Sequence, residues 1–386
     1  MRNPLSEKIV EIKPSGIRKF FDVVKSIDGA ISLGVGEPDF DTPWHIRDEG
    51  IYSLEKGRTF YTSNSGLMEL KVEICNYLKR RQNAMYTPDK QVLVTVGGSE
   101  AIDLALRAMV DPGDEVLIPQ PSYVSYEPCA ILAGAKPVII ELKEENEFRL
   151  TAEEILEHVT DKTKILVLPF PNNPTGAIME RKDLEAIAKV IIEKDLFVIS
   201  DEIYSELTYT DKHVSIVEIP GMYERTVLIN GFSKSYAMTG WRLGYACGPE
   251  EILTQMTKIH QFAIMCAPTT SQYAAVEALK NGDEDVAMMR EQYNQRRRYL
   301  INELRGMGLP CFEPFGAFYI FPCIASLGMS SDDFATKLLQ EEKLAVVPGT
   351  AFGDCGEGFI RISYAYSLDD LKKAMERMRR FIENHK

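Results

Sequence analysis

One segment of the chain carries a lysine and an arginine in surroundings that suit covalent chemistry. Residues 230–244 have the sequence NGFSKSYAMTGWRLG, and three small residues lie near Lys234: Gly231, Ser233 and Gly240. A lysine amine can form a Schiff base only after it loses its proton, and partial burial beside another cation favours that loss. Arg242 can supply this cation and can also bind a phosphate through two hydrogen bonds. Lys234 alone would be interpreted as a surface lysine, but the whole segment favours a reactive amine.

Asp201 and residues 97–99, like Lys234, lie where apolar runs end. Asp201 directly follows one apolar run, and Lys234 lies shortly after another. In α/β sheets, ligands bind beyond the carboxyl ends of such strands, and a carboxylate buried there is costly without a charged partner. Residues 97–99, Gly-Gly-Ser, lie between a third apolar run and a helix expected near Glu100. Free backbone N–H groups at a helix start bind phosphate, and glycine lets the phosphate approach closely.

The segment around Lys234 resembles the lysine-attachment signature of the class I/II (fold type I) aminotransferases, which depend on pyridoxal 5′-phosphate (PLP). Eight further motifs, in the family's order, extend the resemblance over essentially the whole chain. They occupy residues 15–18, 33–40, 61–67, 97–101, 121–123, 172–176, 200–204 and 361–363. Each motif is weak alone, but eight in the same order leave little room for coincidence. The pattern resembles that of the aspartate and aromatic aminotransferases.

The resemblance implies a role for each residue around the cofactor. Lys234 would bind PLP as a Schiff base, and Asp201 would pair with the ring nitrogen, so that the ring accepts electrons when the substrate's α-proton leaves. Tyr123 would stack on the ring, while Tyr204 and Asn173 would hydrogen-bond its phenolic oxygen. The cofactor-binding set that the resemblance implies is Gly97, Gly98, Ser99, Tyr123, Asn173, Asp201, Tyr204, Ser233, Lys234, Arg242 and, reaching the neighbouring subunit, Tyr61.

The resemblance also implies how the substrate is bound. Arg361 would bind the α-carboxylate, a task that suits the fork of a guanidinium, with Gly36 and Asn173 beside it. The implied catalytic residues are Lys234, Asp201 and Tyr204. The freed Lys234 amine would carry a proton between Cα and the C4′ carbon of the cofactor.

Two local features follow from the same resemblance. Gly231 stands where the better-known aspartate enzymes have a hydroxyl residue, and Ser233 is expected to substitute for it. The bond between Asn173 and Pro174 is expected to be cis, as it typically is in relatives.

Short apolar runs alternate with helical patterns over the middle of the chain. The runs cover residues 92–96, 115–118, 137–141, 165–168, 196–200, 226–230 and 243–247. Runs that are apolar on both faces are typical of strands covered by helices on both sides. Helical spacing, as at Leu184, Ile187, Ala188 and Ile191, fills the stretches between them. The pattern predicts an α/β fold with a large doubly wound domain and a mainly parallel seven-stranded sheet.

The last hundred residues have a different pattern. A polar helix is expected from about 283 to 305 and a charged helix from about 368. Shorter apolar segments lie between them, at 318–321, 345–347 and 359–362. We therefore expect a large PLP-binding domain over 46–280 and a smaller α+β domain built from both termini, 1–45 and 281–386.

Composition excludes several classes of protein. A net charge of −13 disfavours a nucleic-acid binder, and we interpret the basic run 296–298 as a solvated helix face. The seven cysteines form no CxxC pair and the five histidines no HxxxH spacing, so a disulfide framework or metal site has no support. No apolar segment approaches the roughly 20 residues needed to span a membrane. We expect a soluble cytoplasmic protein.

The expected function is ping-pong transamination from an L-amino acid (aspartate, alanine or an aromatic amino acid) to a 2-oxo acid such as 2-oxoglutarate. The resemblance implies a homodimer with shared active sites. The main alternative is a PLP-dependent carbon–sulfur β-lyase, in which only the path of the carbanion differs. A PLP-sensing regulator would need an added DNA-binding domain, and a nucleotide-binding protein would need a glycine-rich loop that this sequence lacks.

The preferred substrate stays open at this point among aspartate, alanine, aromatic amino acids and a diaminopimelate-type intermediate. Arg361 would contact only the α-carboxylate, and no second arginine can be assigned to a dicarboxylic side chain. The candidates for the side-chain pocket are Ile17, Tyr61, Asn64, Met265 and Phe352.

Overall fold

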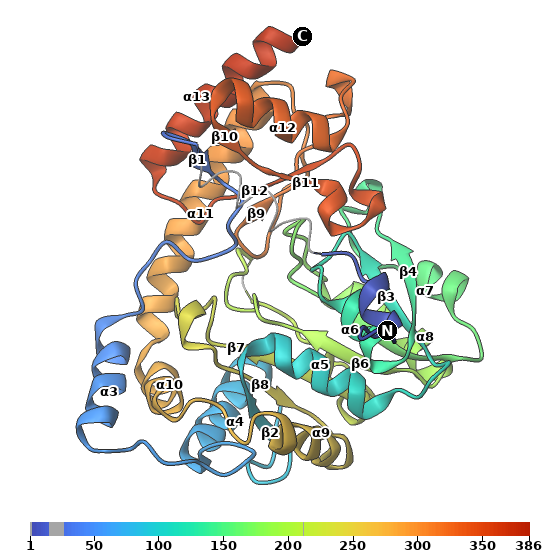
Figure 1. The fold of residues 1–386 in the computed structure, drawn as a ribbon, viewed down its shortest axis with the longest axis vertical. Helices are drawn as coiled ribbons and strands as arrows, with labels where there is room; N and C mark the ends of the chain where they lie inside the picture. The colour runs from blue at the N-terminus through green and yellow to red at the C-terminus, as the bar shows by residue number, and fades with distance from the viewer. Residues whose placement is uncertain (1, 15–26, 211) are drawn as a thin grey trace.

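The large part of the molecule is built on one seven-stranded sheet (Figure 1). The computed structural model describes residues 2–14, 27–210 and 212–386. The strands of this sheet are β2 (Val92–Thr95), β3 (Glu115–Gln120), β4 (Lys136–Glu141), β5 (Thr163–Leu168), β6 (Phe197–Asp201), β7 (Thr226–Gly231) and β8 (Gly244–Cys247). Each of the seven apolar runs in the sequence forms one of them, because strands buried on both faces are apolar throughout.

The order of the strands brings several loops to one edge. The order is β2-β8-β7-β6-β5-β3-β4. Strand β8 is antiparallel to both of its neighbours, and the other pairs are parallel. The mainly parallel sheet is therefore confirmed. The carboxyl ends of β2, β6 and β7 lie at the same edge, where the sequence places 97–99, Asp201 and Lys234.

Helices cover both faces of the sheet, and successive strand residues point to opposite faces. Leu93 packs with α5, α6 and α9 on one face, whereas Val92 and Val94 belong to the cluster with α4, α8 and α10 on the other. The helices of this part are α3 (Trp44–Glu55), α4 (Met68–Gln82), α5 (Gly97–Met109), α6 (Tyr126–Ala133), α7 (Ala152–His158), α8 (Arg181–Glu193), α9 (Glu250–Ala263) and α10 (Thr269–Asn281).

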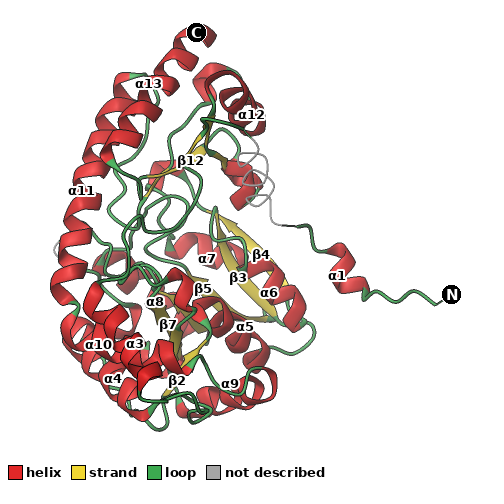
Figure 2. Cartoon of the chain, turned by 60° about the vertical axis from the view of Figure 1, so that its left-hand side comes forward, coloured by secondary structure: helices red, strands yellow, loops and turns green. Residues whose placement is uncertain are grey.

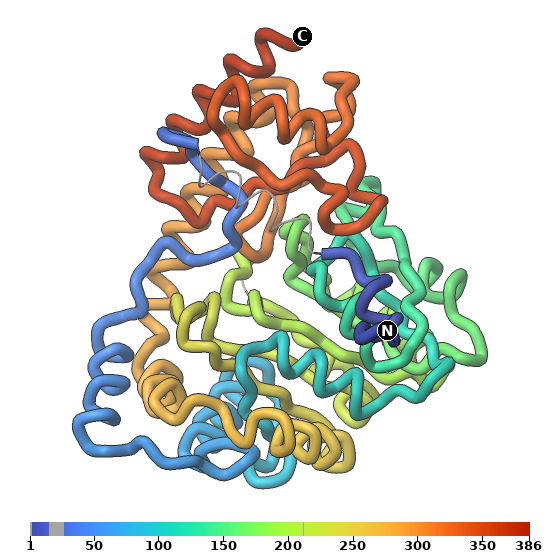
Figure 3. Tube along the Cα trace, viewed as in Figure 1, coloured from blue at the N-terminus to red at the C-terminus, as the bar shows by residue number. Residues whose placement is uncertain are grey.

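The second part of the molecule combines two small sheets with three helices, at the top of Figures 1 and 3. One sheet pairs β1 (Ile31–Ser32) with β10 (Leu344–Ala345) in parallel. The other has the order β11-β12-β9. Its strands and the helices are β9 (Tyr319–Ile320), β11 (Val347–Pro348), β12 (Ile360–Ser363), α11 (Asp283–Gly306), α12 (Ser331–Glu342) and α13 (Leu368–His385).

A smaller α+β unit that draws on both ends of the chain is thus present. Helix α11 runs along one side of the molecule and joins the two parts (Figure 2), contacting α10 near its start and α13 further along. The domain boundaries near 45 and 280 stay predictions. Among the described residues, the one further α-helix is α1 (Glu7–Glu11), which has no buried residue. The motif at 15–18 and the candidate Ile17 lie outside the described residues.

The interpretation of 296–298 as a solvated face is wrong for two of its three arginines. Arg296 and Arg297 are buried. Arg296 pairs with Asp39 at 2.7 Å, and Arg297 pairs with Glu313 at 2.9 Å. Asp39 is distant in sequence, and Glu313 lies beyond the end of α11, so the local charge pattern could not reveal either partner. In residues 2–14, 27–210 and 212–386, none of the helices is both long and apolar enough to cross a membrane.

Candidate active site

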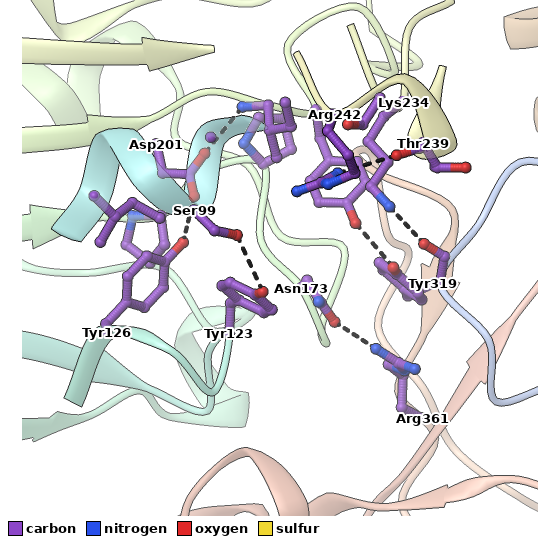
Figure 4. Close-up of a pocket in the computed structure, with 18 residues that line it drawn as sticks. Ser99, Tyr123, Tyr126, Asn173, Asp201, Lys234, Thr239, Arg242, Tyr319 and Arg361 are labelled. Atoms are coloured by element: carbon purple, nitrogen blue, oxygen red, sulfur yellow. Dashed lines mark hydrogen bonds between the residues drawn. The ribbon is translucent and has the colours of Figure 1, made fainter. Parts of the chain in front are cut away.

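A cavity of about 330 Å³ opens at the carboxyl edge of the large sheet (Figure 4). Residues from both parts of the molecule line it, because β9 and β12 face this edge. Eleven of the predicted site residues are among its lining: Gly36, Gly98, Ser99, Tyr123, Asn173, Asp201, Tyr204, Ser233, Lys234, Arg242 and Arg361. Gly97 lies next to this lining, and Tyr61 does not belong to it.

Lys234 is positioned by the turn that follows β7. Its Nζ donates to the backbone oxygen of Gly36 at 2.5 Å. Burial, helped by the positive charges of Arg361 and Arg242 and opposed by Glu37, lowers the pKa of the Lys234 ammonium to about 8. An amine with this pKa is partly neutral near pH 8, so it can act as a nucleophile or a base.

Asp201 is the last residue of β6 and lies buried beside the cavity. Its Oδ2 accepts a hydrogen bond from the Tyr126 hydroxyl at 2.8 Å, and its Oδ1 accepts one from the Ile203 N–H at 3.2 Å. Burial raises the pKa of the Asp201 carboxyl, and these two hydrogen bonds oppose the rise. No Lys, Arg or His of the described chain forms an ion pair with Asp201, so the carboxylate is suited to a cationic ligand.

The first turn of α5 forms an anion site with a nearby arginine. Gly97 has φ +76°, and a Cβ built on it would lie 2.6 Å from an Nη of Arg242. Glycine is required there both for this backbone conformation and for the approach of the guanidinium. Ser99 and Ser233 add hydroxyl groups to the lining. Helix N–H groups, two hydroxyls and a guanidinium together favour a phosphate.

The absence of a hydroxyl at Gly231 has a steric reason. A Cβ on Gly231 would lie 3.0 Å from the Gly244 Cα and 3.0 Å from the Leu243 oxygen. Strands β7 and β8 therefore leave little room for a side chain here, and the neighbouring backbone would have to give way by a few tenths of an ångström. Ser233, which lines the cavity, is the hydroxyl residue available in its place.

Arg361 projects from β12 into the opposite side of the cavity. Its Nη1 donates to the Asn173 Oδ1 at 2.8 Å, and its Nη2 donates to the Gly34 oxygen. Its guanidinium carbon lies 4.5 Å from the ring centre of Tyr319 and 4.8 Å from that of Phe352. The buried Nε has no hydrogen-bond partner among the described residues. This cation is thus held in one plane and can bind a carboxylate.

Tyr204 and Tyr319 contact each other in the lining of the cavity. Their hydroxyl oxygens are 2.8 Å apart, and both side chains are buried. Ser99 and Tyr123 form a second pair in the lining, with hydroxyl oxygens 3.5 Å apart (Figure 4).

Several candidates for the substrate side-chain pocket do not line this cavity. Tyr61 is 80 % exposed, and Asn64 donates to the Met265 oxygen at 2.9 Å. Phe352 packs on Arg361 from outside the lining set. The predicted cis bond between Asn173 and Pro174 is present.

Two tyrosines that line the cavity, Tyr126 and Tyr319, were not among the predicted site residues. Tyr126 is the first residue of α6, only three positions after the predicted Tyr123, and this closeness in sequence could have indicated it. Tyr319 lies within an apolar run and gave no such signal.

The residues present fit PLP. Its phosphate matches the anion site at the start of α5, its protonated ring nitrogen matches the uncompensated carboxylate of Asp201, and its aldehyde matches the partly neutral amine of Lys234. Within the described ranges no group of three His, Cys, Asp or Glu side chains is placed to hold a metal ion.

Comparison with known proteins agrees with this chemistry. Residues 28–378 match the family described as aminotransferase class I and II. The chain is 46 % identical to an aspartate aminotransferase of Pyrococcus abyssi, with 99 % of each chain covered. It is 45 % identical to aromatic-amino-acid aminotransferase 2 of Thermococcus litoralis, again with 99 % of each covered.

Comparison with a solved structure indicates the same family. The aromatic aminotransferase from Pyrococcus horikoshii superposes with a TM-score of 0.91 at 46 % identity, covering 95 % of this chain and 99 % of that one. A match at this level over nearly the full length shows the family and not only the fold. The chain therefore belongs to the class I and II aminotransferases and is a pyridoxal phosphate-dependent aminotransferase.

Proposed function

We propose that this enzyme moves the amino group of aspartate, alanine or an aromatic amino acid to 2-oxoglutarate, in two half-reactions at one site. The observation that carries the proposal is that Lys234, Asp201 and Arg361 line a single cavity. The printed names of similar proteins, an aspartate aminotransferase and an aromatic-amino-acid aminotransferase, support donors of these two kinds.

Arg361 binds the α-carboxylate shared by all these substrates. The two rings that enclose its guanidinium and the acceptors on both Nη atoms hold the cation in one orientation. The guanidinium is buried and poorly hydrated, and charges attract each other more strongly where water is excluded. A substrate carboxylate therefore binds more strongly here than at a surface arginine. Asn173, which already contacts Arg361 at 2.8 Å, orients the same substrate end.

Lys234 holds the cofactor covalently through Nζ and, once released, moves the proton. A substantial fraction of its amine is neutral near physiological pH because burial lowers its pKa to about 8. It can therefore remove the Cα proton of the substrate as a general base and return it as a general acid. A positioned group of this kind contributes roughly 10²–10⁴-fold to the rate.

Asp201 and Tyr204 set the charge around the cofactor. When bound, PLP supplies an aldehyde that takes up the amino group and a ring that accepts the electrons left by the departing proton. The carboxylate of Asp201 would stabilise the protonated ring nitrogen, and a hydrogen bond from Tyr126 holds this carboxylate in place. With PLP bound, Tyr204 and Asn173 would donate hydrogen bonds toward the phenolic oxygen, while Gly98, Ser99, Ser233 and Arg242, which line the same cavity, would bind the phosphate.

We also propose that two copies of the chain share their active sites. Phe60, Tyr61 and Phe262 are 80 %, 80 % and 84 % exposed, and the 2.9 Å hydrogen bond from Asn64 to the Met265 oxygen links the two segments that carry them. Exposed large apolar side chains on neighbouring segments are typical of an interaction surface. The segment around Phe60 is tied to the start of α10 because Thr269 donates to the Phe60 oxygen at 2.8 Å. A homodimer that covers this surface would bring Tyr61 to the phosphate of the partner subunit.

A donor screen tests the function. Purified enzyme with PLP is incubated with each amino acid and 2-oxoglutarate, and glutamate formation is measured. Aspartate or an aromatic amino acid should give the highest kcat/KM. Pyruvate released from cystathionine without any 2-oxo acid would instead identify a β-lyase.

A lysine variant tests the mechanism. We expect Lys234→Ala to lose transamination by at least about 10²–10⁴-fold while it keeps its circular dichroism spectrum, because it removes the covalent link and the base. Lys182→Ala, a variant at a solvent-exposed lysine, is the matched control and should keep full activity. Borohydride treatment of the unmodified enzyme should label the peptide that contains Lys234. Transamination retained in Lys234→Ala would refute the role.

A further inference from the structure

Tyr319 contacts both ends of the proposed machinery, although it binds neither the cofactor phosphate nor the ring nitrogen. Its hydroxyl oxygen lies 2.8 Å from that of Tyr204, and its ring centre lies 4.5 Å from the guanidinium carbon of Arg361. The side chain is only 1 % exposed and lines the cavity. We propose that Tyr319 is a positioning residue with two separable tasks, its hydroxyl directing the Tyr204 proton and its ring fixing Arg361. This inference rests on the function proposed above.

The hydroxyl task follows from counting protons. Each tyrosine hydroxyl has one proton to donate. If Tyr204 donates its proton toward the phenolic oxygen of the cofactor, the 2.8 Å contact requires Tyr319 to donate to Tyr204. Among the described residues, Tyr319 has no other hydrogen-bond partner for its hydroxyl. A hydroxyl that accepts a hydrogen bond is also a stronger donor, because the two bonds polarise each other.

Gly36 shows that the position of this hydroxyl is built into the fold. A Cβ placed on Gly36 would overlap the hydroxyl oxygen of Tyr319. The residue therefore has to be glycine for the hydroxyl to reach Tyr204. The same residue accepts the hydrogen bond from Lys234 at 2.5 Å through its backbone oxygen, so the Tyr319 hydroxyl and the reactive amine both lie against Gly36.

The ring task follows from the surroundings of Arg361. Tyr319 and Phe352 lie at 4.5 and 4.8 Å from the guanidinium carbon and exclude water from it. A cation over an aromatic ring is stabilised most when both are desolvated. Loss of the Tyr319 ring would leave Arg361 free to tilt, and a tilted guanidinium cannot make two parallel bonds to a carboxylate.

Two substitutions separate the tasks. Tyr319→Phe removes the hydroxyl and keeps the ring, whereas Tyr319→Leu removes both. Tyr364→Phe is the matched control, because Tyr364 is also fully buried and donates to the Ala317 oxygen at 3.2 Å but does not line the cavity. The three variants are purified with PLP and compared with the unmodified enzyme.

The first readout is the pH titration of cofactor absorbance. A weaker hydrogen bond from Tyr204 leaves more negative charge on the phenolic oxygen, which favours protonation of the nitrogen that joins Lys234 to the cofactor. We expect Tyr319→Phe to raise the pH midpoint of the absorbance change by about 0.5–1. Tyr364→Phe should leave the midpoint unchanged.

The second readout is KM for the amino donor. Tyr319→Phe should keep KM within about 2-fold, and Tyr319→Leu should raise it by about 3–30-fold. If Tyr319→Leu does not fold, Phe352→Leu removes the opposite ring and should raise KM in the same range.

The outcomes distinguish this proposal from the proposed function. If the unmodified enzyme shows no pH-dependent absorbance and no borohydride label at Lys234, the proposed function itself fails. If the unmodified enzyme titrates normally but Tyr319→Phe moves the midpoint no more than Tyr364→Phe, the hydroxyl task is overturned. An unchanged KM in Tyr319→Leu, or in Phe352→Leu where it replaces that variant, overturns the ring task.

Discussion

Lys234 differs chemically from the surface lysines of the same chain. Burial lowers its pKa to about 8, whereas a hydrogen bond to Glu180 raises the pKa of the exposed Lys182 above its ordinary value. Only the neutral amine reacts with aldehydes and acylating reagents. Because the neutral fraction rises as pH rises through the pKa, the two lysines become reactive in different pH ranges.

This difference can be measured on the cofactor-free enzyme. Labelling of Lys234 by an acylating reagent, quantified by mass spectrometry, should reach half of its maximal rate near pH 8, the value to which burial lowers its pKa. Lys182 in the same sample should still be increasing in reactivity at about pH 10, the ordinary range of a lysine. A common midpoint for both lysines would contradict the effect of burial. A raised midpoint for Lys234 in Arg361→Gln would support the contribution of that positive charge.

The packing of α5 against β8 determines where the anion site lies. A Cβ on Gly244 would lie 2.6 Å from both the Gly97 carbonyl carbon and the Gly98 nitrogen. Both contacts are to backbone, so a side chain could be accommodated only if the first turn of α5 moved. Gly240 lies in the turn just before β8, and a Cβ added there would have no atom of the described chain within 4 Å.

Gly244→Ala should therefore weaken PLP binding as well as folding. We expect unfolding in urea to show a loss of about 1–3 kcal/mol, the usual cost of overpacking. The Kd for PLP, measured by fluorescence titration, should rise because the helix N–H groups are displaced. Gly240→Ala, the control, should change neither quantity appreciably. Normal PLP affinity in Gly244→Ala would show that the anion site tolerates movement of α5.

The elements that could be predicted from sequence are those whose burial is uniform. All seven strands of the large sheet lie at apolar runs, and six of them are largely buried because helices cover both faces of the sheet, whereas the edge strand β4 is only partly buried. The small strands β1, β10 and β11 contain two residues each, too few for a pattern. Their pairing depends on contacts between distant segments, as between Ile31 and Leu344.

The site could be predicted only where a motif or a strand end indicated it. Lys234 and Asp201 lie at or just after the ends of strands of the large sheet, and both line the cavity. Tyr126 and Tyr319 were missed because their importance comes from partners far away in sequence, Asp201 and Tyr204. Arg296 and Arg297 were misinterpreted for a related reason, since Asp39 and Glu313, which neutralise them, lie outside the helix that carries them.

At the scale of the whole molecule, the exposed apolar surface at Phe60, Tyr61 and Phe262 predicts the assembly state. Phe262→Asp should convert a dimer into monomers in sedimentation velocity, because a charge buried in an interface is costly. Activity should fall with it, since Tyr61 could no longer reach the partner's phosphate.

A control distinguishes assembly from general damage. Leu156 on α7 is also exposed, at 46 %, but lies on a different helix from the surface at Phe262. Leu156→Asp should stay dimeric and active. Dimers that persist in Phe262→Asp would place the interface elsewhere.

Strand order also affects how the chain is made on the ribosome. Strand β2 pairs only with β8 in this sheet, and β1 pairs only with β10 among the described strands. Each of these early strands therefore emerges long before its partner has been translated. Until residues 244–247 leave the exit tunnel, the apolar strand at residues 92–95 lacks its pairing partner, and unpaired apolar strands favour aggregation during synthesis.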